Sequence, residues 1–334
     1  MVNNDSCNDG MQSKIIYAYA YLVIFVPGLL GNSIAVWVLI SFIREKRKGI
    51  IFMTNLAFAD LAHVLSLPLR VYYYLNSDWP FQHSMCLLCY YLKYVNMYAS
   101  IAFLVFISVQ RCLFVIKPFR ANSWKQKYDI MLSIAAWIVV GICCIPFTTI
   151  RNSGPVHNDT AHTVNERICF ADLPTNKVSQ VRLIAMIFMV EIIGFAIPLI
   201  VISVCTWKTL SHLKNHKELC PERTEKQKAA RMVSLCAVVF LVCFVPYHLN
   251  NPLHMMIKQN MIMHCNTQRL VNTFHVVSLC LASLNCCINP LIYFFVVQEF
   301  RERLDWHGCR ELHPCISGKD GETFVKEEEL CHSN

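Results

Sequence analysis

The run Leu183-Ile-Ala-Met-Ile-Phe-Met-Val-Glu191-Ile-Ile-Gly-Phe-Ala-Ile-Pro198-Leu-Ile-Val-Ile-Ser-Val-Cys205 contains a single charged residue, Glu191. A helix needs about 20 mostly apolar residues to cross the hydrocarbon core of a bilayer, so this run predicts a membrane span. Six further stretches qualify by the same criterion. The seven predicted spans are residues 16–42, 50–75, 85–114, 128–150, 182–210, 229–257 and 268–297.

The composition excludes most other classes of protein. Apolar residues make up 55% of the 334-residue chain and charged residues 16%, against about 25% in an ordinary soluble domain. A soluble domain would need more polar surface, and a disordered chain would hold fewer apolar residues. The net charge of +8 is not gathered on a soluble domain, so nucleic acid is not an expected partner. We predict an all-α membrane protein, a seven-transmembrane helix bundle over residues 16–297.

Three segments flank this predicted bundle. Residues 1–15 form an N-terminal tail, and residues 308–334 are polar and predicted to be a disordered tail. Between the bundle and that second tail, residues 298–307 alternate apolar and charged side chains, which predicts a short amphipathic eighth helix in the membrane interface. Cys309 and Cys315 follow this segment and are candidates for palmitoylation, with free thiols as the alternative.

Basic residues set the expected topology. They gather in the odd-numbered loops, for example at Lys46-Arg-Lys48, whereas the loop between the second and third predicted spans has none. Loops rich in Lys and Arg face the cytoplasm, so the N-terminus is expected outside and the chain in the plasma membrane. The glycosylation sequons that begin at Asn4 and Asn158 both fall on the expected outer side.

Four cysteines lie on the same expected outer side: Cys7, Cys86, Cys169 and Cys265. They allow three pairings. A Cys86–Cys169 bridge would pin the long fourth loop across the mouth of the bundle, and Cys7–Cys265 would then tie the N-terminal tail to the last outer loop. Cys86-Leu-Leu-Cys89 could instead suggest zinc or redox chemistry, but no second ligand pair has a suitable spacing.

Short motifs inside the spans narrow the family. They are, in chain order, Gly31-Asn32, Asn55-Leu-Ala-Phe-Ala-Asp60, Ser108-Val-Gln-Arg111-Cys112, Trp137, Pro198, Phe240-Leu-Val-Cys243-Phe244-Val-Pro246-Tyr247-His248 and Asn289-Pro290-Leu-Ile-Tyr293. This set resembles the rhodopsin-like G-protein-coupled receptors over about residues 15–307. Stretches such as Asp78-Trp-Pro-Phe81 and Cys205-Thr-Trp-Lys208 resemble, within them, the purinergic-receptor-like lysophosphatidylserine receptors.

The resemblance implies an ion site around Asp60. An ionised group inside a membrane span is costly and usually functional. Similarity brings neutral groups near it, and these are Asn32, Ser100, Asn285 and Asn289. One carboxylate with several neutral oxygens suits an allosteric sodium ion, and a protonated Asp60 that shares hydrogen bonds with the amides is the alternative. No other metal or cofactor is expected.

The resemblance also implies an activation pathway. Arg111 ends the third span, and where relatives usually have an acidic residue before this arginine, the chain has Gln110. An amide cannot form the ion pair, so a weaker inactive-state lock and basal signalling are expected. Hinges are expected in the sixth and seventh spans, and a heterotrimeric G protein is the expected partner, with arrestin a further candidate. The remaining residues assigned to activation and coupling are Phe119, Phe244, Pro246, Pro290 and Tyr293.

Cations and hydrogen-bonding groups gather at the opposite, expected outer end of the spans. An arginine fork with a lysine holds a phosphate well, so Arg70 with Lys93 predicts an anionic head group, and Glu191 could meet an ammonium. The other candidate ligand contacts are Tyr94, His248, Asn251, Arg269 and His275. By resemblance the ligand is an extracellular lysophospholipid, first of all lysophosphatidylserine, and signalling runs through the twelve/thirteen class of G proteins and Rho.

Three other functions are weighed against this one. A nucleotide receptor needs the same cations and is the nearest alternative. A transporter or channel is the alternative from another class, although internal repeats and broken helix pairs are not evident. An enzyme is not expected, because no catalytic motif occurs in a suitable context.

Overall fold

The structure is a computed structural model that describes residues 10–45, 49–151, 168–173, 176–215, 220–262 and 264–296. Within these residues, seven helical segments are long and apolar enough to cross a membrane, and each overlaps one predicted span. The prediction of a seven-helix membrane bundle is therefore confirmed. The predicted eighth helix at 298–307, the tail at 308–334, Cys7, Asn4, Asn158, Cys309 and Cys315 lie outside the described residues.

Five spans are single helices, and two are interrupted. The continuous spans are α1 (Gly10–Arg44), α2 (Ile50–Asn76), α3 (His83–Ile116), α5 (Gln126–Arg151) and α10 (Cys265–Val296). The fifth span comprises α6 (Gln180–Glu191), η3 (Ile192–Ala196) and α7 (Ile197–Asn215), and the sixth comprises α8 (Cys220–Val239), η4 (Phe240–Phe244) and α9 (Val245–Lys258). Two short helices, α4 (Pro118–Ser123) and η2 (Phe170–Asp172), lie between spans.

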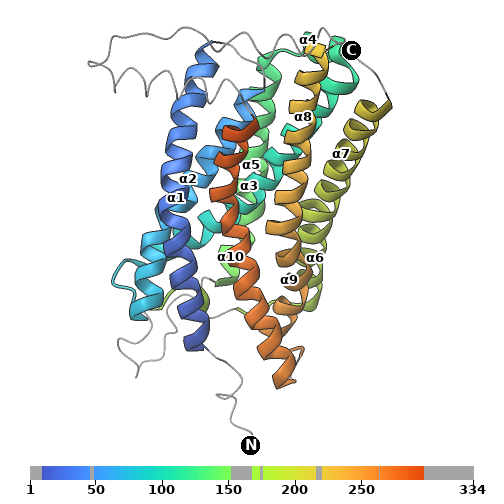
Figure 1. The fold of residues 1–334 in the computed structure, drawn as a ribbon. Coiled ribbons are helices and arrows are strands. Elements are labelled where there is room, and N and C mark those ends of the chain that lie inside the picture. The colour runs from blue at the N-terminus through green and yellow to red at the C-terminus, as the bar shows by residue number, and fades with distance from the viewer. Residues whose placement is uncertain are drawn as a thin grey trace, which may run out of the picture.

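Helix α3 is the centre of the bundle (Figure 1), since it packs against α2, α5, α7 and α8, while α1 packs against α2 and α10. The end of the bundle that holds Cys86 is called the disulfide end below, and it is at the bottom of Figure 1. The other end holds α4 and is called the Arg111 end. The fold thus offers two separate ends where a functional site can form.

Both interruptions are π-helical, and each is followed by a proline within two residues. Segment η3 ends two residues before Pro198, and η4 ends two residues before Pro246. A proline lacks the N–H and crowds the carbonyl four residues earlier, and a π turn relieves this by pairing residues five apart. Accordingly the N–H of Ile197 donates to Ile192 O, and that of Val245 donates to Phe240 O. The sixth span is therefore irregular next to Pro246, in the form of a π turn, and its action as a hinge stays a prediction.

Helix α1 begins at Gly10, within the segment predicted as tail. The extra turn is held by tertiary contacts, because Lys14 Nζ lies 2.8 Å from Asp172 Oδ2 and donates to Ser77 Oγ at 3.1 Å. One turn further, the ring of Tyr17 stacks on Tyr74 with centroids 4.8 Å apart. Composition favoured a tail here because these contacts come from distant parts of the chain.

Candidate functional site

A disulfide and the residue after it close the disulfide end of the bundle. Cys86 at the start of α3 is bonded to Cys169, with Cα atoms 5.8 Å apart, which confirms that predicted pair. Cys265 is also disulfide-bonded, but Cys7 lies outside the described residues, so the Cys7–Cys265 pair stays a prediction. Phe170 follows Cys169 directly, has φ 52° and is buried, and its ring contacts Tyr73, Tyr74 and Trp79.

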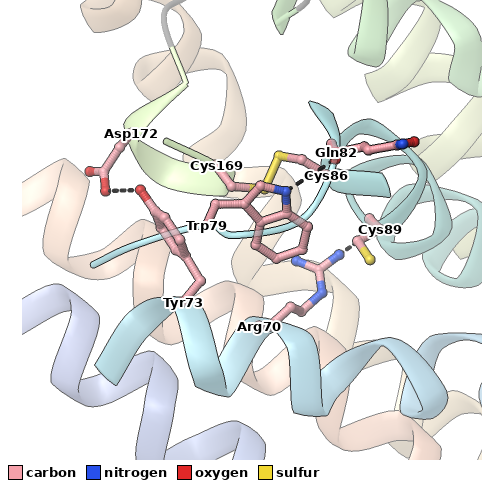
Figure 2. The surroundings of a disulfide bond; sticks show 8 residues. All are labelled: Arg70, Tyr73, Trp79, Gln82, Cys86, Cys89, Cys169 and Asp172. Carbon is pink, nitrogen blue, oxygen red and sulfur yellow. Dashed lines mark hydrogen bonds between the residues drawn. A yellow bond between two sulfur atoms is a disulfide. The ribbon is translucent and has the colours of Figure 1, made fainter. Parts of the chain in front are cut away.

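Arg70 lies beneath this aromatic cover. Its guanidinium is 4.6 Å from the ring centroid of Phe170, and the side chain is 1% exposed. It donates to Ser66 Oγ at 3.4 Å and to the carbonyl oxygen of Cys89, and Figure 2 shows the group turned toward Cys89 below Trp79. On the other side of the cover, Tyr73 donates to Asp172. The sequence analysis assigned Arg70 to a ligand, but its side chain is buried and donates hydrogen bonds within the protein.

A cavity of about 100 Å³ opens beside this cover and carries an excess of positive charge. Lys14, Lys93, Arg151 and Lys258 line it, with Asp172 as the carboxylate among its lining residues. Lys93 lies over the rings of Tyr90 and Tyr94, at 5.0 and 4.5 Å from their centroids. The remaining lining residues are Ser13, Tyr17, Tyr74, Phe170, His254, Asn272, His275, Val276 and Leu279.

Several predicted ligand contacts line this cavity, and others do not. Lys93, Tyr94 and His275 line it, and the rings of His254 and His275 stack with centroids 3.6 Å apart. Arg70 is absent from its lining, and Arg269 is exposed on α10. The sequence reasoning missed Lys14, Arg151 and Lys258. A usable signal existed for two of them, because Arg151 and Lys258 each end a span at the disulfide end.

The other three predicted contacts meet one another. Glu191 Oε2 is 3.3 Å from His248 Nδ1, and Glu191 Oε1 accepts from Asn251 Nδ2 at 3.3 Å. The ring of Phe195 lies between Phe240 and His248, stacked on each with centroids 5.9 and 4.7 Å away. These contacts join the two interrupted spans next to their π segments. The carboxylate expected to meet a ligand ammonium thus already accepts a hydrogen bond from Asn251 and lies beside the ring of His248.

An apolar groove of about 510 Å³ lies between α3, α5 and the fifth span. Its lining includes Met186, Met189 and Gly194 of the fifth span. Phe147 lines the groove and stacks on Tyr94, which lines the cationic cavity, with centroids 4.4 Å apart and rings nearly parallel. One pair of aromatic rings therefore separates the cationic cavity from the apolar groove.

Asp60 is fully buried in the middle of the bundle. Its two carboxylate oxygens accept from Asn96 Nδ2 and Asn289 Nδ2, each at 2.8 Å. Asn32 donates instead to the carbonyls of Gly28 and Cys286. Ser100 Oγ and Asn289 Oδ1 are buried without a hydrogen-bond partner in the described part of the chain, as is Asn285 Nδ2. A carboxylate with nearby neutral oxygens fits the ligand preference of a sodium ion. Asn96 was missed.

The predicted activation residues are spread along the bundle, from the π segment of the sixth span to the Arg111 end. Phe244 is buried within η4, and Pro246 follows in α9. Tyr293 is buried and donates to Met53 O at 3.4 Å, three residues after Pro290 in α10. Phe119 on α4 is 92% exposed. An exposed aromatic side chain on a short helix next to the end of α3 is available for contact with a partner protein.

A helical bundle with this bridge, a buried mid-span carboxylate and an arginine at the end of α3 defines a receptor class. Residues 31–293 match the family "7 transmembrane receptor (rhodopsin family)", and the chain belongs to this family. It is thus a G-protein-coupled receptor, which has a ligand and a G-protein partner, and it is not an enzyme.

Several known receptors are similar to this chain over most of their length. The putative purinoceptor 10 of Homo sapiens is 51% identical over 305 residues, which cover 91% of this chain and 88% of that protein. "Probable G-protein coupled receptor 174" of Homo sapiens is 49% identical over 319 residues, or 95% and 94%. "Lysophosphatidic acid receptor 6" of Mus musculus is 31% identical over 315 residues, or 93% and 90%. The resemblance to the rhodopsin-like receptors, and within them to a purinergic-receptor-like branch, is confirmed.

Proposed function

We propose that this receptor responds to an extracellular anionic lysophospholipid, first of all lysophosphatidylserine, and signals through the twelve/thirteen class of G proteins. The proposal places the receptor in the plasma membrane with its N-terminus outside the cell. The observation that carries it is the pairing of a cation-lined cavity with an apolar groove across one aromatic wall. A lysophospholipid has the matching two parts, an anionic head and one acyl chain.

The charge balance of the cavity favours an anionic head. Among the described residues, four cations face one carboxylate, and that carboxylate is already engaged by Lys14 at 2.8 Å and by Tyr73. A phosphate would bring charge-assisted hydrogen bonds, which are roughly twice as strong as neutral ones. Arg151 is well placed for this role because its guanidinium, which donates to Leu173 O at 2.6 Å, keeps further N–H donors.

The groove supports a lipid over a nucleotide. Its lining is almost entirely apolar, and it lies directly across the Tyr94–Phe147 pair from the cations. A nucleotide would use the cations and leave the groove empty. The sodium site at Asp60, the acylation of Cys309 or Cys315 and the glycosylation of Asn4 and Asn158 belong to the same proposal.

The test is a nucleotide-exchange assay on the full-length receptor in reconstituted vesicles. Lysophosphatidylserine is compared with lysophosphatidic acid, ATP and UDP, each with purified heterotrimers of every G-protein class. The proposal expects exchange with lysophosphatidylserine on the twelve/thirteen class and its loss in Lys93→Ala. Exchange driven by ATP or UDP alone would establish the nucleotide alternative, and solute uptake or current without a G protein would establish a transporter or channel.

A further inference from the structure

Asp129 is a buried carboxylate at the Arg111 end that the receptor mechanism described above does not use. It lies in the first turn of α5 and is 2% exposed. Its Oδ1 accepts from Trp124 Nε1 at 2.7 Å, and its Oδ2 accepts from Gln110 Nε2 at 3.2 Å. These donors come from the residue that follows α4 and from the end of α3, so one carboxylate joins three segments.

These residues share a wall with Arg111. Gln110, Arg111, Trp124 and Asp129 all line one cavity of about 320 Å³. Gly49, the residue before α2, has φ 79° and packs against this wall from the other side, because a Cβ built there would lie 3.0 Å from both Gln110 Oε1 and Arg111 Nη2. The position before Arg111 is therefore packed against α2 and bonded to α5.

We propose that Asp129 supplies the negative charge that position 110 lacks, and that through Gln110 and Trp124 it restrains the end of α3 and the adjoining α4 in the inactive arrangement. Asp129 is a positioning residue in this scheme, because it acts on Arg111 through the neighbouring Gln110. In this scheme the acidic group lies on α5, whereas Arg111 lies on α3. The restraint is an amide-to-carboxylate hydrogen bond inside the bundle, where both partners are screened little by water.

The same geometry explains why residue 110 is neutral. A carboxylate at that position would face Asp129 at about the distance of a hydrogen bond, where two like charges cannot both ionise without a large cost. A glutamine side chain instead presents a donor to the carboxylate. Restoring an acid at position 110 should therefore break the restraint, whereas the lock expected from the sequence alone would be strengthened by it.

The experiment measures ligand-free nucleotide exchange on a purified heterotrimer by the full-length receptor in phosphatidylcholine vesicles, per folded receptor. Asp129→Asn and Trp124→Phe are expected to raise the basal rate at least about fivefold, the lower end of typical coupling between sites. Gln110→Asp is expected to raise it as well. The double variant Gln110→Glu with Asp129→Asn again pairs a carboxylate with an amide at the side-chain lengths of the parent, and it is expected to return the rate to within about twofold of the parent.

Ser133→Ala is the matched control, since Ser133 is buried one turn further along α5 and its Oγ has no hydrogen-bond partner in the described part of the chain. Its basal rate is expected to equal that of the parent. A fall in basal exchange for Gln110→Asp would overturn the proposal, and so would an unchanged rate in Asp129→Asn or the absence of rescue in the double variant. None of these readings depends on the ligand, so they stand apart from the test of the lysophospholipid.

Discussion

Arg151 and Arg70 both lie at the disulfide end of their helices, but only Arg151 lines the cationic cavity. Arg70 is covered by Phe170 and bonded to Ser66 and Cys89, whereas Arg151 lines the cationic cavity. A hydrogen bond to a charged group contributes about 1.5–3 kcal/mol. Arg151→Ala should therefore weaken the potency of lysophosphatidylserine roughly tenfold to a hundredfold in the exchange assay.

The controls for this prediction separate charge from folding. Arg151→Lys keeps the charge and should recover part of the potency, although it loses the forked geometry. Arg182→Ala removes an exposed arginine at the start of α6 that does not line the cavity, and its potency should match the parent. Equal losses in Arg151→Ala and Arg182→Ala, at equal amounts of folded receptor, would show that the cavity does not hold the ligand.

At Asp60 the prediction concerns sodium. The carboxylate has two amide donors and, in the part of the chain that the structure describes, nearby oxygens without a hydrogen-bond partner. Asp60→Asn keeps the shape of the side chain and removes its charge. The proposed site predicts that raising sodium lowers the affinity of lysophosphatidylserine in the parent, since an ion that favours the inactive state shifts the receptor away from the state that binds agonist. In Asp60→Asn the affinity should not change with sodium. Potassium at the same ionic strength is the control, and equal effects of the two salts would argue against a specific ion site.

At the scale of elements, the π segment η3 of the fifth span packs closely against α3 at Gly194. A Cβ at Gly194 would lie 2.8 Å from Cε1 of Tyr98, so Gly194→Ala forces the ring or the helix to move. Overpacking of this kind costs about 1–3 kcal/mol. We expect a lower thermal unfolding temperature for Gly194→Ala, measured on the purified receptor.

Two further variants test the cause of that loss. Gly141→Ala meets only the hydroxyl of Tyr91 at 3.3 Å and should cost less. In a Tyr98→Leu background the contact with the ring is gone, so the added effect of Gly194→Ala should shrink. If the two substitutions were additive, the clash with Tyr98 would not be the cause.

For the whole molecule, sequence reasoning succeeded where the cause is local and failed where it is distant. Span positions follow from apolar length, whereas the expected outer side left three cysteine pairings open, and the structure selects Cys86–Cys169. The burial of Arg70 could not be foreseen, because Phe170 lies one hundred positions further along the chain. The same holds for Gln110, whose partner Asp129 sits on another span. Lys93 was found because it is a rare cation inside an apolar run.

The position of the cationic cavity and the apolar groove on either side of the Tyr94–Phe147 pair leads to a prediction about acyl-chain length. Cys143 lines the groove on α5 and is exposed, so Cys143→Trp should fill part of the groove without disturbing the buried core. The cationic cavity stays intact in this variant, since Cys143 is not part of its lining. Lysophosphatidylserine with an eighteen-carbon chain should lose about tenfold in potency, in line with the cost of overpacking, while a ten-carbon form should lose less. Cys143→Ser changes the side chain without filling the groove and should leave the order of chain lengths as in the parent. An equal loss for both chain lengths would mean that the acyl chain lies elsewhere, even if the head group occupies the cationic cavity.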